Sequence, residues 1–128
     1  SKTLDILDEV VDDLEPTIIT LNGWLRIVPP DKCERYNIYN GHPGLITKYP
    51  ELKGKDPQKR AWDDLHKYYK VGSVVHKVVE EVDAGDVETV CETSTASILT
   101  LDDTYNELRK TSLNAWYSFL KERLYNTV

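Results

Sequence analysis

The stretch Thr17-Ile-Ile-Thr-Leu21 is β-branched and apolar on both faces of a pleated strand. Such a run is typical of a parallel strand that helices cover on both sides. Pro29-Pro30 then begins a short helical turn through Tyr36, and a second strand follows at Asn37-Ile-Tyr-Asn40. A strand, a helix and a strand in this order predict a right-handed parallel crossover, and therefore a fold of the α/β class.

Helical periodicity flanks this unit on both sides. Upstream, apolar residues at helical spacing predict an amphipathic surface helix over residues 3–14. These residues are Leu4, Leu7, Val11 and Leu14. Downstream, Thr100 and Asp103 form a near capping box, which predicts the start of a helix that runs to about Asn126. We expect this helix to pack an apolar stripe on the sheet. The stripe consists of Tyr105, Leu108, Trp116, Phe119 and Leu120.

The middle of the chain alternates loop, helix and strand. Residues 41–55 are rich in Gly, Pro and Lys without a period, and this pattern predicts a long loop. Asp56-Pro57 supplies an N-cap and a first-turn proline for a helix that ends near His66. Alternating β-branched residues predict strands over residues 73–79 and 87–93.

Composition limits the class of protein. The chain has 128 residues, and 16 Lys and Arg against 22 Asp and Glu give a net charge of -6 without a basic block. This balance disfavours a nucleic-acid or anionic membrane partner. Apolar runs stay far below the roughly 18 residues of a membrane span, and the N-terminus lacks a signal-peptide pattern, so we expect a cytoplasmic protein. Cys33 and Cys91 lack CxxC partners and are expected to be reduced thiols.

No repeat or interior linker divides the chain, so residues 1–128 are predicted to form one domain. The expected architecture is α/β, with a mainly parallel, twisted sheet flanked by helices and a long C-terminal helix.

Three polar residues stand at the predicted strand ends. Asn40 and His42 directly follow one strand, and Asp83 lies in a turn after another. In open α/β sheets, ligands bind outside the carboxyl ends of strands, so an amide, an imidazole and a carboxylate could converge there. The same residue types are also common in ordinary turns. Residue types alone therefore leave both interpretations open.

Three blocks of the sequence resemble the glycinamide ribonucleotide formyltransferase family. Asn40-Gly-His-Pro-Gly-Leu-Ile-Thr-Lys-Tyr-Pro50 is similar to the family's Asn-x-His-Pro-[Ser/Gly]-Leu-Leu-Pro-Lys-Tyr segment. Leu21-Asn-Gly-Trp-Leu-Arg-Ile-Val28 is similar to its Gly-Phe-Met-Arg-Ile-Leu loop. Gly72-Ser-Val-Val-His76 and Glu80-Glu-Val-Asp-Ala-Gly85 match its Gly-Thr-[Ser/Thr]-Val-His and Asp-Glu-x-Asp-x-Gly blocks. The blocks occur in the family's order, and the resemblance covers residues 15–125.

The resemblance implies a partial Rossmann-like formyltransferase fold and a reaction. A formyl group would pass from 10-formyltetrahydrofolate to a primary amine of a small phosphorylated acceptor such as glycinamide ribonucleotide, within one-carbon metabolism and purine biosynthesis. Asn40, His42 and Asp83 would be the catalytic residues. Asn40 would donate to the formyl oxygen as its negative charge develops. His42 would carry protons, and Asp83 would orient the imidazole and stabilise its charged form.

The resemblance also implies a folate site. An apolar slot for the pterin ring would be formed by Trp24, Leu25, Arg26, Ile27 and Val28. Backbone groups there and at Glu80, Glu81 and Val82 would bind the edge of the ring. Core packing of Trp24 and a solvated Arg26 are the alternatives.

Three further features are interpreted as structural. We expect His76 to be a hydrogen-bonded structural histidine, because it lies inside an alternating strand. His42, His66, His76 and Asp83 lack metal-ligand spacing, so no metal site is predicted. The basic segment from Lys53 to Arg60 is expected to be a solvated loop face, with phosphate binding as the alternative.

The sequence departs from the family's pattern in two places. Nothing corresponds to the family's N-terminal strand and its phosphate-binding Gly-Ser-Asn loop. The strand at Thr17–Gly23 could therefore have an open edge, which favours pairing with a second copy or with an N-terminal partner segment. Arg109 and Ser112 stand where purine-pathway members carry Gln and Glu toward the ribose.

These departures keep other functions open. The acceptor could be a nucleotide-linked amino sugar or an aminoacyl-tRNA, although the acidic charge argues against tRNA. A non-catalytic folate-binding or interaction module is the third reading.

Overall fold

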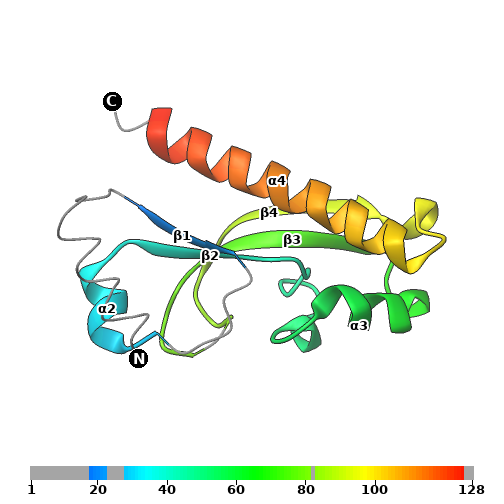
Figure 1. The fold of residues 1–128 in the computed structure, drawn as a ribbon, viewed down its shortest axis with the longest axis horizontal. Coiled ribbons are helices and arrows are strands. Elements are labelled where there is room, and N and C mark those ends of the chain that lie inside the picture. The colour runs from blue at the N-terminus through cyan, green and yellow to red at the C-terminus, as the bar shows by residue number, and fades with distance from the viewer. Residues whose placement is uncertain (1–17, 23–27, 82, 126–128) are drawn as a thin grey trace.

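A four-stranded sheet forms the centre of the computed structural model, which describes residues 18–22, 28–81 and 83–125. Its strands are β1 (Ile19–Asn22), β2 (Ile38–His42), β3 (Lys70–Lys77) and β4 (Val87–Ser94), in the order β1-β2-β3-β4. Figure 1 shows α4 along one face of the sheet and the shorter helices α2 and α3 on the other side. The α/β class expected from the sequence is therefore confirmed.

The described sheet is mixed. β1 pairs with β2 in parallel, in the register Ile19 to Ile38, as the crossover pattern predicts. β2 pairs with β3, and β3 with β4, in antiparallel fashion. The connection between β3 and β4 is too short for a parallel crossover, which needs a dozen or more residues. The parallel pairing that we expected for most of the sheet is thus confined to β1 and β2 in the described part of the chain.

Helix α2 (Pro30–Arg35) provides the crossover between β1 and β2, and it begins at the second of the two prolines as predicted. The chain on either side of it packs into a small apolar cluster. The buried members of this cluster are Val28, Tyr36, Ile38 and Val78. The apolar cluster therefore anchors the start of β2.

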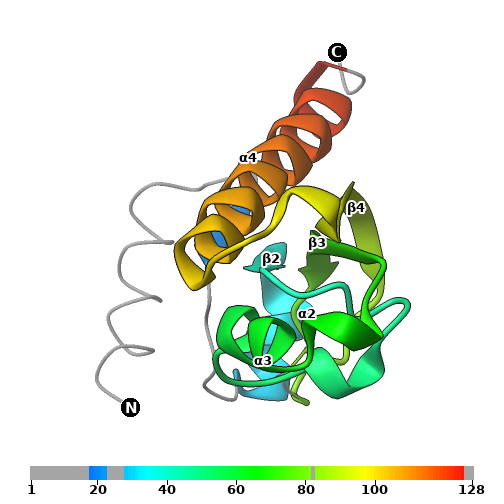
Figure 2. The ribbon, with the colours of Figure 1, turned by 90° about the vertical axis from the view of Figure 1, so that its right-hand side faces the viewer.

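Helix α4 (Leu101–Tyr125) lies across β3 and β4, and both views of the ribbon show it crossing the sheet obliquely (Figure 2). Thr100 and Asp103 cap it reciprocally, since the Asp103 amide donates to Thr100 Oγ1 at 3.1 Å and the Thr100 amide donates to Asp103 Oδ2 at 3.1 Å. The predicted capping box is confirmed. Leu108 and Phe119 of the expected stripe are each 1% exposed. Burial of this stripe fixes the helix on the sheet.

Short helices fill the segment between β2 and β3. They are η1 (Pro50–Leu52), α3 (Pro57–Asp63) and η2 (Leu65–Lys67), and a further turn, η3 (Thr95–Ser97), precedes α4. Asp56 caps α3 as expected, because its carboxylate accepts from the Lys59 amide. α3 ends before the predicted His66, which lies in η2. Leu52, Ala61 and Tyr68 bury the segment against the sheet.

Several expected features lie outside the described residues. These are the helix over residues 3–14, the residues Trp24, Leu25, Arg26 and Ile27, and Val82. Within the described residues, no helix is both long and apolar enough to cross a membrane.

Gly85 closes the turn between β3 and β4, and a Cβ atom there would overlap the Lys77 carbonyl oxygen. Because that obstacle is backbone, the hairpin cannot yield locally, and we predict that Gly85→Ala lowers the free energy of unfolding by about 3 kcal/mol. Urea denaturation measures this value. Leu99→Ala, at an exposed side chain, should change it by less than about 0.5 kcal/mol. Equal effects of the two variants would contradict the steric argument.

Candidate active site

β2 presents Asn40 and His42 on one face of the sheet. The sequence placed both residues after a strand, but β2 continues through His42, because Gly41 and His42 still pair with Val75 and Val74 of β3. Alternation along the strand points Asn40 and His42 to the same side. Asn40 is 2% exposed and His42 is 1% exposed. Both side chains therefore lie inside the protein at the end of the strand.

Gly41 lies between these residues, and its lack of a side chain allows α4 to pack closely on the opposite face of β2. A Cβ atom at Gly41 would lie 2.6 Å from Nε1 of Trp116 in α4. The indole of Trp116 thus packs directly on the backbone of β2. Asn40 and His42 consequently point away from α4, toward the side covered by the segment between β2 and β3.

Asp83 joins this group from the connection between β3 and β4. Its backbone is left-handed, with φ of 57°, and its side chain is buried. The carboxylate Oδ2 lies 3.4 Å from His42 Nδ1 and accepts from the Gly54 amide at 2.8 Å. The other oxygen, Oδ1, lies 3.2 Å from His76 Nε2. The structure therefore brings His42 and Asp83 into contact, with Asn40 on the same face of the sheet.

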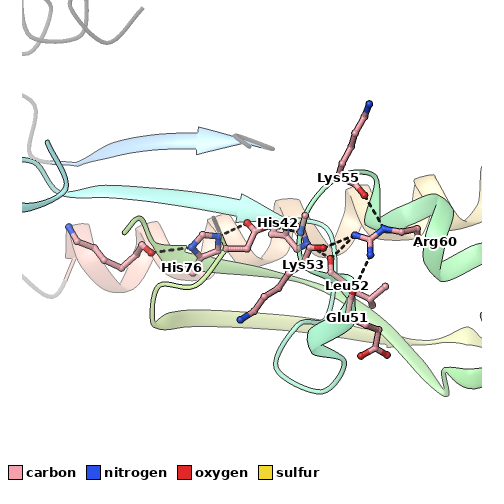
Figure 3. A network of polar contacts seen from close by, with 10 residues as sticks. His42, Glu51, Leu52, Lys53, Lys55, Arg60 and His76 are labelled. Atoms are coloured by element: carbon pink, nitrogen blue, oxygen red, sulfur yellow. Dashed lines mark hydrogen bonds and ion pairs between the residues drawn. The ribbon is translucent and has the colours of Figure 1, made fainter. Parts of the chain in front are cut away.

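His76 belongs to the same network, which the sequence did not predict. His76 pairs with Asn40 across β2 and β3, and its Nδ1 contacts the Lys77 carbonyl at 3.1 Å. It is hydrogen-bonded as expected, and one of its two partners is Asp83. Figure 3 shows His76 and His42 in one chain of polar contacts. Only the strand register, which a single sequence does not reveal, places His76 opposite Asn40.

The proton on His42 can be assigned from its partners. His42 Nε2 lies 2.8 Å from the Leu52 carbonyl oxygen. A carbonyl oxygen only accepts, so Nε2 carries the proton and donates it. Burial lowers the pKa of His42, although the charge of Asp83 and the Leu52 carbonyl oppose that shift. The neutral ring therefore leaves Nδ1, the nitrogen beside Asp83, without a proton.

Asp83 is held in its ionised form. Burial alone would raise its pKa, but the hydrogen bonds from His76 and the Gly54 amide outweigh burial, and a positive charge on either imidazole, once protonated, acts in the same direction as these bonds. The pKa of Asp83 is consequently below its usual value. A carboxylate beside a neutral imidazole is an arrangement that favours proton uptake by the ring.

The expected folate-binding residues are only partly described. Val28 is buried in the apolar cluster with Tyr36 and Val78, so its side chain belongs to the core. Glu80 and Glu81 are exposed in the connection that leads to Asp83. Their role toward a ligand stays a prediction. In the described part of the chain, no three His, Cys, Asp or Glu side chains are grouped to hold a metal ion.

A cavity of about 220 Å³ opens at the ends of β1 and β2. Asn22, the last residue of β1, and Pro43, which follows His42, form part of its wall. Gln58 of α3 and three residues of α4 complete the lining, namely Tyr105, Arg109 and Ser112. Most of these side chains are polar. The cavity therefore offers a polar binding surface one residue beyond His42.

The ionised Asp83 predicts a pH-dependent stability. Since its pKa is lower in the folded chain, Asp83 stabilises the fold above its ordinary pKa of about 3.9, and this contribution is lost as the pH falls through the lower folded-state value. Asp83→Asn should lower the free energy of unfolding by about 2 kcal/mol at pH 7, and by less at pH 3.

Urea denaturation at the two pH values measures this difference. Asp86→Asn, at an exposed residue of the same connection, is the control and should have little effect at either pH. A penalty for Asp83→Asn that does not change with pH would contradict the assignment of an ionised carboxylate.

Comparison with known proteins identifies similar sequences and a similar fold. The phosphoribosylglycinamide formyltransferase of Dictyostelium discoideum is 38% identical over 79 residues, which are 55% of this chain and 37% of that protein. The methionyl-tRNA formyltransferase of Thermotoga neapolitana is 32% identical over 116 residues, which are 89% of this chain and 36% of that protein. The chain thus spans little more than a third of the length of either relative.

A solved structure shares the fold. The phosphoribosylglycinamide formyltransferase of Streptococcus pneumoniae superposes with a TM-score of 0.81 at 22% identity, over 96% of this chain and 67% of that one. The sequence profile described as formyl transferase matches residues 2–120. Since this match covers nearly the whole chain, the protein belongs to the formyl transferase family.

Proposed function

We propose that this chain carries the catalytic group of an enzyme that transfers a formyl group from 10-formyltetrahydrofolate to a primary amine. The observation that carries the proposal is the buried contact of His42 with Asp83, with Asn40 on the same face of the sheet. Membership of the formyl transferase family supports the same reaction. Folate is expected to bind near residues 24–28 and 80–82.

The reaction exchanges one carbon–nitrogen bond for another. The acceptor amine attacks the formyl carbon, the bond from that carbon to the folate nitrogen breaks, and a proton moves from the amine to the departing nitrogen. In the proposed mechanism the Asn40 amide donates to the formyl oxygen while it carries negative charge. His42 accepts the amine's proton at Nδ1 and later releases it.

Asp83 supports this proton transfer. Its Oδ2 lies 3.4 Å from His42 Nδ1, so a proton taken up at Nδ1 would be stabilised by an adjacent negative charge. The neutral ring and the ionised carboxylate are the resting states that such a step needs. His76 and the Gly54 amide hold the carboxylate in place from its other sides.

We further propose that the acceptor is a small phosphorylated amine such as glycinamide ribonucleotide. The cavity at the ends of β1 and β2 supports this proposal, because Arg109 gives its lining a positive charge. No hydrogen bond or ion pair joins the Arg109 guanidinium to another residue in the parts of the chain that the structure describes. A guanidinium is well suited to bind a phosphate through two parallel hydrogen bonds.

Two alternative acceptors and one non-catalytic function remain as outcomes of experiment. The resemblance to a methionyl-tRNA formyltransferase over 89% of this chain favours an aminoacyl-tRNA acceptor, whereas the net charge of -6 disfavours it. A nucleotide-linked amino sugar would also present an amine and phosphates. A non-catalytic folate-binding module would bind folate without transferring the formyl group.

Asn40→Ala tests the proposed role of the amide. Without a donor for the developing oxyanion, the rate constant kcat should fall about 100- to 1000-fold. The affinity for a non-reactive folate, measured by calorimetry, should change far less. Asn114→Ala removes an exposed amide of α4 and should leave both values unchanged. Equal losses of rate and folate affinity would argue against transition-state stabilisation.

Arg109→Ala tests the proposed acceptor. Loss of a charged hydrogen-bonding group should raise KM for glycinamide ribonucleotide about 10- to 100-fold, with little change in folate affinity. Lys110→Ala is the matched control, because Lys110 is adjacent but pairs with Glu107 instead of lining the cavity.

Steady-state kinetics with a panel of amines measures this effect. The panel should include glycinamide ribonucleotide, a nucleotide-linked amino sugar and methionyl-tRNA. Turnover of methionyl-tRNA alone would replace the proposed acceptor. Folate binding without turnover of any amine would favour the non-catalytic module.

A further inference from the structure

Arg60 of α3 binds the chain that precedes its own helix. Its Nε donates to the Lys55 carbonyl at 2.9 Å, and its Nη1 donates to the Glu51 carbonyl at 2.6 Å. Its Nη2 donates to the carbonyls of Leu52 at 3.2 Å and Lys53 at 2.8 Å. Figure 3 shows the guanidinium among these four carbonyls. The sequence predicted a solvated loop face here; Arg60 is partly exposed, and its guanidinium in addition binds backbone carbonyls.

The segment that Arg60 binds also contacts the proposed catalytic pair. The Leu52 carbonyl accepts from His42 Nε2 at 2.8 Å, and the Gly54 amide donates to Asp83 Oδ2 at 2.8 Å. The Leu52 carbonyl is therefore shared between the Arg60 guanidinium and the His42 ring. One short stretch of backbone thus fixes one nitrogen of the histidine and one oxygen of the aspartate.

Regular secondary structure covers only part of this stretch. η1 ends at Leu52 and α3 begins only at Pro57, so residues 53–56 lie between helices. Gly54 adopts the left-handed conformation, with φ of 93°. A guanidinium carries five N–H donors in one rigid plane. Here its four hydrogen bonds reach four different carbonyls. A lysine ammonium donates from a single point and cannot span the same set.

We propose that Arg60 is a positioning residue for the reaction, which holds the Leu52 carbonyl and the Gly54 amide against His42 and Asp83. The inference rests on the proposed catalytic role of that pair. Arg60 acts through the backbone of residues 51–55 and does not itself touch Asp83. The same conformation of the segment forms the four bonds to Arg60 and presents Leu52 and Gly54 to the pair.

Charge adds a second effect of the same residue. Burial is the main cause that lowers the pKa of His42, and the nearby charges of His76 and Arg60 lower it further. Asp83 and the Leu52 carbonyl oppose them. Opening of the segment would expose the ring and remove the Arg60 charge, and both changes raise the pKa. The lost Leu52 bond acts in the other direction but is a smaller cause than burial.

The experiment measures the site directly, without turnover. Nitrogen-15 NMR follows the titration of the His42 ring, and hydrogen exchange follows the Gly54 amide, in the unmodified chain and in Arg60→Ala. We expect the His42 pKa to rise toward its ordinary value of about 6.5 in the variant. We expect protection of the Gly54 amide to fall by about tenfold or more. The amides of β3 serve as an internal control and should stay protected.

Two further variants separate geometry from charge and from general stability. Arg60→Lys keeps the positive charge but lacks the planar guanidinium with its several donors. Protection of the Gly54 amide from hydrogen exchange should therefore fall as in Arg60→Ala. Lys59→Ala removes a charge from the same helix, where Lys59 pairs with Asp63, and should leave both readouts unchanged. If Arg60→Ala proves too unstable to study, the comparison of Arg60→Lys with Lys59→Ala decides the question.

The proposal is overturned if Gly54 protection and the His42 titration stay unchanged in Arg60→Ala, or if Arg60→Lys keeps full Gly54 protection. Its outcome is independent of the reaction itself. A chain that binds folate but transfers no formyl group would refute the proposed function. The titration of His42 and the hydrogen exchange of the Gly54 amide would still show whether Arg60 positions the segment.

Discussion

The buried carboxylate of Asp83 is the interaction on which the site depends. A carboxylate without water is very costly unless it is paired and hydrogen-bonded. Here His76 Nε2 and the Gly54 amide bond to its two oxygens, and His42 Nδ1 lies 3.4 Å from one of them. These partners come from β2, β3 and the segment before α3, while Asp83 itself comes from the β3–β4 connection. Four separate parts of the chain therefore meet at one buried carboxylate.

The buried polar group and the cavity are formed by different elements of the fold. Residues of the strands and their connections form the buried polar group, whereas α4 lies on the opposite face. In its N-terminal half, Tyr105, Arg109 and Ser112 line the cavity. Ser112 is tied to the sheet, because its hydroxyl contacts Ser73 at 2.8 Å. The surface available to an acceptor can thus change with α4 while the polar group stays constant.

Local signals in the sequence predicted local structure well. The cap formed by Thr100 and Asp103, the apolar stripe of α4 and the proline at the start of α3 are each set by residues within a few positions of one another. The parallel pairing of β1 and β2 was also predicted, because a crossover connection leaves a recognisable order of patterns. The positions of Asn40, His42 and Asp83 at predicted strand ends made their convergence possible, and the family resemblance made it the expected arrangement.

Features that depend on tertiary pairing were not predicted. β2 extends to His42 because β3 pairs with it, and His76 reaches the site because the register sets it opposite Asn40. Arg60 lies in a segment whose basic composition is typical of a solvated surface. Its four carbonyl partners become apparent only from the folded path of residues 51–55. Strand register and the course of an irregular segment arise from contacts across the fold, which no single stretch of sequence encodes.

The contact between Gly41 and Trp116 has an evolutionary consequence. The indole occupies the place where any other residue at position 41 would carry its first side-chain atom. A larger residue at position 41 would displace the Trp116 indole from the strand, and the strand carries Asn40 and His42 on both sides of that point. Side chains at the two positions therefore compete for the same space, and a natural variant that gains bulk at 41 should carry a smaller residue at 116.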